Sequence, residues 1–140
     1  MTNGARFGWG RVILGIIASE ALPVLALVLV VGVYSAMRRA DSPTPEEFAP
    51  IAGEWVGPIG GFLATLFFSR WAASRATVRP IAHGAAVGLG TAILDVSIGI
   101  MLGGAGAILL VFVVSNVGRI VAGFLGGWLG ARRGNLADAA

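Results

Sequence analysis

The chain has 140 residues, of which 56% are hydrophobic and 12% are charged, and its formal net charge is +3. Soluble domains carry roughly a quarter charged residues, so this composition excludes an ordinary water-soluble domain. The sequence has no cysteine and one histidine, which excludes disulfides, thiolate metal sites and multi-histidine metal sites. We therefore expect an integral membrane protein without a metal or other cofactor.

Four apolar runs are long enough to cross a bilayer, since about 20 apolar residues in a helix span its core of roughly 30 Å. In chain order they cover residues 12–37, 51–72, 81–102 and 105–131, with a proline-rich outer loop at 38–50. None alternates in the manner of an outer-membrane barrel strand. The first run is also longer than the apolar part of a signal peptide, so we expect it to remain as a span. The sequence predicts an all-α fold, a four-helix transmembrane bundle that forms a single integral membrane domain over residues 1–140.

The basic residues, all arginines, indicate the orientation of the chain in the membrane. They precede the first predicted helix, surround the connection between the second and third, and follow the fourth: Arg6, Arg11, Arg70, Arg75, Arg79, Arg132 and Arg133. In the first connection, by contrast, Arg38 and Arg39 are accompanied by acids. Because cytoplasmic loops carry the excess of basic residues, we predict a multi-pass protein of the plasma membrane with both termini cytoplasmic.

Charged and polar residues near the predicted helix ends are expected to meet the lipid headgroups. We predict that anionic headgroups contact the arginines that flank the spans: Arg70, Arg75, Arg79, Arg132 and Arg133. The arginine distribution follows the membrane topology, so we expect no nucleic-acid partner. Glu54 and His83 are expected to face headgroup water.

Two segments of the sequence resemble each other. Residues 56–70, VGPIGGFLATLFFSR, and 117–132, VGRIVAGFLGGWLGAR, share Val, Gly, Ile, Gly, Phe, Leu and a terminal Arg when one insertion is allowed. The helix before each segment carries one acid, Glu20 or Asp95. One interpretation is two tandem helical hairpins related by a pseudo-twofold axis along the membrane normal. The other is a chance similarity between two glycine-rich membrane helices.

Small residues recur at helical spacing along the third and fourth predicted helices. The two stripes are Gly84, Gly88, Thr91, Asp95, Gly99 and Gly103, and Ser115, Arg119, Ala122, Gly126 and Gly130. Small residues let membrane helices approach closely, so we expect these faces to point toward protein rather than lipid. We further expect the glycine stripes to support a homo-oligomer, with a membrane partner subunit as the alternative.

Three charged residues fall inside the predicted spans: Glu20, Asp95 and Arg119. Each would cost about 2.5 to 3.5 kcal/mol at the bilayer centre if it were isolated. With a rise of about 1.5 Å per residue, Arg119 lies between the two acids in depth. We predict that the three form one buried group. The expected supporting polar residues are Ser19, Thr91, Ser115 and Asn116.

The predicted group has a formal charge of −1, so one carboxylate needs a proton, a cation or hydrogen-bond donors. We expect Glu20 to be the protonatable member, because Pro23 leaves the carbonyl of Ser19 without its usual helical partner beside that acid. In this interpretation Glu20 and Asp95 bind a proton or small cation, Arg119 is their counter-charge, and the protein passes or couples such ions.

A second interpretation gives the charged group a structural role. Buried charges also fix helix register or hold a partner, which would make the protein a non-catalytic structural or assembly subunit of a larger membrane complex. The sequence predicts no enzyme, because it offers neither a nucleophile with a supported base nor clustered metal ligands.

Overall fold

The computed structural model describes residues 7–101 and 109–137, which form four helices. In chain order these are α1 (Trp9–Met37), α2 (Pro45–Ser74), α3 (Pro80–Met101) and α4 (Leu109–Ala137). Each helix is long and apolar enough to span a membrane. The prediction of an all-α bundle of four long apolar helices is confirmed. Residues 102–108, where the predicted fourth helix begins and the stripe residue Gly103 lies, are outside the described part.

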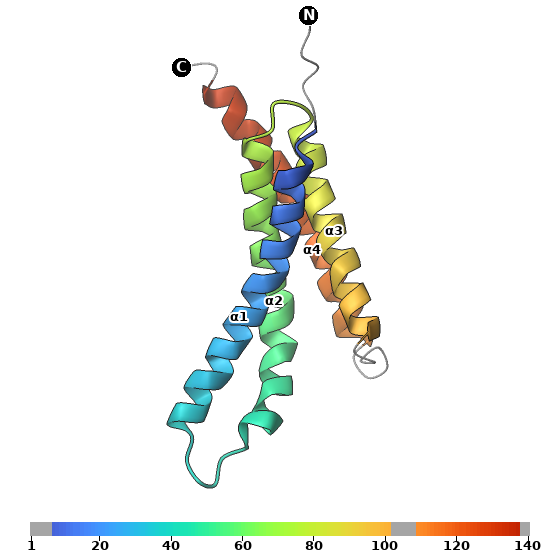
Figure 1. The fold of residues 1–140 in the computed structure, drawn as a ribbon. Helices are drawn as coiled ribbons and strands as arrows, with labels where there is room; N and C mark the ends of the chain where they lie inside the picture. The colour runs from blue at the N-terminus through green and yellow to red at the C-terminus, as the bar shows by residue number, and fades with distance from the viewer. Residues whose placement is uncertain (1–6, 102–108, 138–140) are drawn as a thin grey trace, which may run out of the picture.

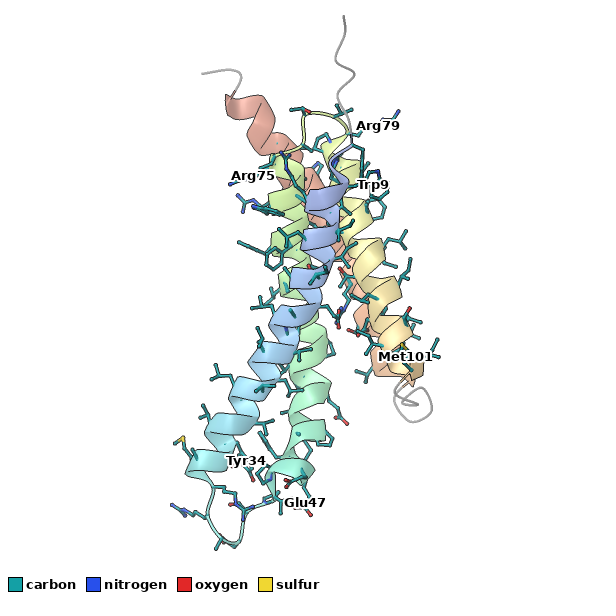
Figure 2. The ribbon with its side chains drawn as sticks, viewed as in Figure 1. Trp9, Tyr34, Glu47, Arg75, Arg79 and Met101 are labelled. Atoms are coloured by element: carbon teal, nitrogen blue, oxygen red, sulfur yellow. The ribbon has the colours of Figure 1, made fainter. Side chains whose placement is uncertain are left out.

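The two ends of the bundle differ (Figure 1). The start of α1, the end of α4 and the α2–α3 connection lie together at one end, which we call the terminal end. The α1–α2 connection lies at the opposite end, the loop end. Figure 2 places Arg75 and Arg79 at the terminal end and Tyr34 and Glu47 at the loop end. The four helices are close together near the terminal end, whereas the α1–α2 and α3–α4 pairs diverge toward the loop end.

Helix α2 begins at Pro45 rather than at residue 51, so the connection is shorter than the loop predicted for residues 38–50. The Thr44 side chain accepts a hydrogen bond from the backbone N–H of Glu47, whose carboxylate accepts one from the backbone N–H of Thr44 at 2.8 Å. Pro45 occupies the first helical position, where its missing N–H has no helical partner to lose. This capping box starts the helix inside a segment whose prolines had suggested a loop.

Glycines pack α4 closely against both α3 and α2. On one face Gly123 and Gly127 meet Gly88 and Gly84 of α3, and a Cβ at Gly88 would lie 2.8 Å from the Cα of Gly123. On another face a Cβ at Gly126 would lie 2.6 Å from the carbonyl oxygen of Leu66 in α2. Gly84, Gly88 and Gly126, which belong to the predicted stripes, therefore face protein, as expected, whereas Gly123 and Gly127 lie outside the predicted stripe of the fourth helix. They are used within the chain, so a homo-oligomer would have to form through other surfaces.

Helix α1 packs antiparallel to α2. A Cβ at Gly60 would lie 3.4 Å from the Cβ of Pro23, and one at Gly15 would lie 3.8 Å from the carbonyl oxygen of Phe68. Pro23 thus meets a glycine at the place where α1 lacks a helical hydrogen bond. Toward the terminal end, Val12 of this helix is fully buried with Ala72 of α2 and Val87 of α3.

The contacts between the two hairpins are not equivalent. Within the described residues α1 packs against α2 and α3 but not along α4, whereas α2 packs against both α3 and α4. A strict twofold axis would give α1 and α4 the same contact as α3 and α2. The proposed pseudo-twofold relation between the hairpins therefore stays a prediction.

Candidate functional site

Arg119, near the middle of α4, is buried and lies between two acids. Its side chain is 4% exposed. Its Nη1 donates a hydrogen bond to Oε2 of Glu20 in α1. Its Nη2 lies 3.6 Å from Oδ1 of Asp95 in α3. The predicted charged group is confirmed, and it joins three of the four helices through one guanidinium.

Helix α2, which contributes no charge to the group, supplies the space for that guanidinium. A Cβ at Gly61 of α2 would lie 2.9 Å from both Nε and Nη2 of Arg119 and 3.0 Å from its Cζ. The guanidinium therefore lies against the α2 backbone, where any larger residue would displace it. Gly61 is one of several glycines in α2. Its role depends on which side chain crosses that point, which residue spacing does not reveal.

Asp95 is held by Asn116, which lies on the same helix as Arg119. Nδ2 of Asn116 donates to Oδ2 of Asp95 at 2.9 Å and to the carbonyl oxygen of Phe112 at 3.0 Å. The amide thus fixes one carboxylate oxygen and leaves Oδ1 as the oxygen nearest the guanidinium. Asn116 lies among the expected supporting residues, and it contacts an acid directly.

The other three expected supporting residues are placed differently. The Thr91 hydroxyl donates to the carbonyl oxygen of Val87 in its own helix at 2.8 Å. The Ser19 hydroxyl is fully buried and has no hydrogen-bond partner within the described part of the chain. Ser115 borders a cavity that also reaches Arg119. Only Asn116 is joined to an acid by a hydrogen bond among the described contacts of these four residues.

The cavity of about 390 Å³ lies between the hairpins and is lined by α2, α3 and α4. Asp95 and Arg119 are the lining residues of α3 and α4 closest to the terminal end, while the rest of the lining on these helices extends toward the loop end. Glu20 does not line this cavity. On the side of the acids toward the terminal end, the close contact of Gly88 with Gly123 brings the α3 and α4 backbones together. The charged group is thus bordered by the cavity on one side and by close helix packing on the other.

Glu54 also lines this cavity, from α2. It is exposed, as expected. The sequence predicted contact with headgroup water, however, and did not predict the cavity. The cavity arises because the helix pairs diverge, and helical periodicity in a sequence does not report the angle between two helix pairs. Glu54 is therefore a site residue that the sequence did not identify.

His83 is buried, so the expectation that it is solvated is wrong. It is 1% exposed, and Phe7 stacks on its ring with centroids 3.8 Å apart. The backbone N–H of Gly8 donates to its Nε2 at 2.9 Å, so the ring proton lies on Nδ1, which is 3.1 Å from the carbonyl oxygen of Arg79. Phe7 and Gly8 thus contact this histidine, which no residue pattern had indicated.

Exposed arginines surround the terminal end. Arg11 donates a hydrogen bond to the carbonyl oxygen of Arg75, and the Arg132 guanidinium lies 3.7 Å from the centroid of the Trp128 ring. Arg70, Arg75, Arg79 and Arg132 are all exposed, and the side chain of Arg133 is not among those that the structure describes. Contact with anionic headgroups stays a prediction for all five.

The arrangement places one positive charge between two acids. Arg119 neutralises one carboxylate fully, and the group retains a formal charge of −1, which a proton or a cation would balance. The chain matches no family model, and neither the curated proteins nor the solved structures contain a match to it.

Proposed function

We propose that this small four-span membrane protein passes or couples protons or small cations, with Glu20 and Asp95 as the binding acids and Arg119 as their counter-charge. The single observation that carries the proposal is the sharing of one buried guanidinium by two acids on different helices. One positive charge cannot neutralise both carboxylates. A low-dielectric interior makes the remaining charge costly, and binding of a proton or cation removes that cost.

The two acids differ in their access to the cavity, so the proposal gives them different roles. Asp95 borders the cavity, whereas Glu20 lies on the other side of the guanidinium and does not. A proton or cation bound at Asp95 would leave Arg119 to pair with Glu20. Protonation of Glu20 would instead favour pairing of Arg119 with Asp95. The guanidinium would thus couple occupancy of one acid to release from the other.

The test is ion flux into proteoliposomes that contain the purified protein. Internal pH and internal Na⁺ and K⁺ are followed with dyes after a gradient of each ion is imposed. The proposal predicts flux of at least one of these ions above that of empty liposomes, and its loss in Asp95→Asn. Glu46→Gln, at an exposed acid in the first turn of α2, is the control and should keep the wild-type rate. Wild-type rates equal to those of empty liposomes for every ion would overturn the proposal.

The alternative is a non-transporting assembly subunit of a larger membrane complex. The diverging hairpins favour it, because the cavity walls on α2, α3 and α4 offer a surface to a partner helix. In that case flux is absent from the wild type, and Arg119→Ala reduces recovery of a partner that co-purifies with the wild-type protein. A homo-oligomer is a further proposal, tested by the mass of the protein in detergent.

A further inference from the structure

The cavity between the hairpins combines apolar walls with an acid at its inner end. Val96 and Ile100 of α3 and Val111 and Phe112 of α4 form much of its surface. The Phe112 ring is held against α3, since a Cβ at Gly99 would lie 3.2 Å from its Cζ. An apolar cavity with a few convergent polar groups is the usual form of a small-molecule site.

The charges on the lining favour a positive ligand. Of the described lining residues, Asp95 and Glu54 are acidic and Arg119 is basic. The guanidinium is not free to attract an anion, because its Nη1 is bonded to Glu20. Asp95 Oδ1 lies 3.6 Å from Nη2, beyond hydrogen-bond distance, and the Asp95 side chain is 20% exposed. A cation in the cavity would therefore find a partly accessible carboxylate at its inner end.

The size and the walls of the cavity favour an organic cation over a hydrated metal ion. A volume of about 390 Å³ falls in the ordinary range of small-molecule pockets. Aliphatic side chains cannot replace the water around an inorganic ion, but they can cover an apolar body, and Phe112 adds an aromatic ring to the lining. A lipid acyl chain would fit the walls but would bring no charge to Asp95.

We propose that this cavity binds a monovalent organic cation with an apolar body, the positive group at Asp95 and the body against the walls of α3 and α4. The inference rests on the proposed function in one respect, because Asp95 is the same acid in both. It names the class of substrate that this acid would take.

The experiment compares two probes of similar shape and opposite charge, benzyltrimethylammonium and phenylmethanesulfonate. Binding of each is measured by calorimetry on the full chain in nanodiscs of zwitterionic phosphatidylcholine, without an ion gradient. The ammonium ion should bind at least about tenfold more tightly than the sulfonate, because a single carboxylate contact in a partly buried site is worth that much. Equal binding of both probes would mean that the Asp95 charge plays no part, and binding of neither would mean that the cavity takes no such ligand; either result would overturn the inference.

Two variants locate the probe. Asp95→Asn keeps a side chain of the same shape beside Asn116 but removes the charge, and it should weaken benzyltrimethylammonium binding by about tenfold or more. Gly57→Leu fills the cavity from α2, where a Cβ has nothing within 4 Å, and should abolish binding without touching the charged group. Glu46→Gln is the charge-matched control and should bind like the wild type. Unchanged affinity in Gly57→Leu would place the probe elsewhere and contradict the inference.

The equilibrium measurement separates this inference from the proposed function. Binding of the ammonium probe by a protein that conducts no ion would uphold the inference and overturn the proposed function. Ion flux without binding of the probe would uphold the proposed function and overturn the inference.

Discussion

Gly61 of α2 lies against the guanidinium of Arg119 of α4, so that a Cβ at position 61 would stand 2.9 Å from Nε and from Nη2. The adjacent Gly60 meets Pro23 of α1. Two neighbouring glycines thus let one helix accommodate the proline of α1 and the buried charge of α4. The position of the charged group is set as much by this space as by the acids that pair with it.

Gly61→Ala should lower the free energy of unfolding by about 1 to 3 kcal/mol relative to Gly57→Ala, because the added methyl group displaces a buried guanidinium. Both substitutions gain the same helix propensity, and a Cβ at Gly57 has nothing within 4 Å, so the second variant is the matched control. Unfolding in mixed detergent measures both. Equal stability of the two alanine variants would contradict the placement of Arg119.

Arg119→Leu should destabilise the protein by about 3 to 5 kcal/mol, because it leaves two partly buried carboxylates without their counter-charge. Adding Glu20→Gln to this variant should restore part of the loss, since only one carboxylate then remains unpaired. The same unfolding measurement in detergent gives both values. If the double variant is less stable than Arg119→Leu alone, the two residues do not form the ion pair described here.

Asn116→Ala should cost about 1.5 to 3 kcal/mol, the usual value of a hydrogen bond to a charged group, because Oδ2 of Asp95 loses its donor. Ser115→Ala is the control, since Ser115 neighbours Asn116 on α4 and borders the cavity. Thermal unfolding in detergent compares them. A larger loss in Ser115→Ala would mean that the serine, not the amide, holds the acid.

The sequence predicted the four spans and the charged group for a clear physical reason. A long apolar run forms a helix that spans the bilayer. The charges of Glu20, Asp95 and Arg119 would each be costly in the membrane without a partner of opposite charge. The depth of each residue along its helix was enough to bring these three together. Both arguments use only residue type and position along one helix.

Features that depend on how helices meet could not be predicted in this way. Three such features follow from the crossing angles and rotations of packed helices. They are the hydrogen bond of Asn116 to Asp95, the contact of Gly61 with the guanidinium, and the cavity that Glu54 lines. His83 is contacted by Phe7, which stacks on its ring, and by Gly8, whose backbone N–H donates to it. The early start of α2 was present in the sequence as Thr44 and Glu47, but the prolines around them suggested a loop.

The orientation in the membrane can be tested cleanly because the sequence has no cysteine. Ala40→Cys, in the α1–α2 connection, should react with a membrane-impermeant maleimide added to intact cells. Thr77→Cys, in the α2–α3 connection, should react only after the membrane is opened. Both positions are exposed. The reverse labelling pattern would place the arginine-rich terminal end outside and contradict the assignment of cytoplasmic termini.

The most direct test of the central claim is the initial rate of ion flux into proteoliposomes with wild-type protein and with Glu20→Gln, reconstituted at equal density. Glutamine keeps a hydrogen-bond acceptor for Arg119 but cannot carry the charge or exchange a proton. The account predicts clear flux for the wild type and a rate equal to that of empty liposomes for the folded variant. Wild-type flux in Glu20→Gln would contradict the claim that this acid carries the ion.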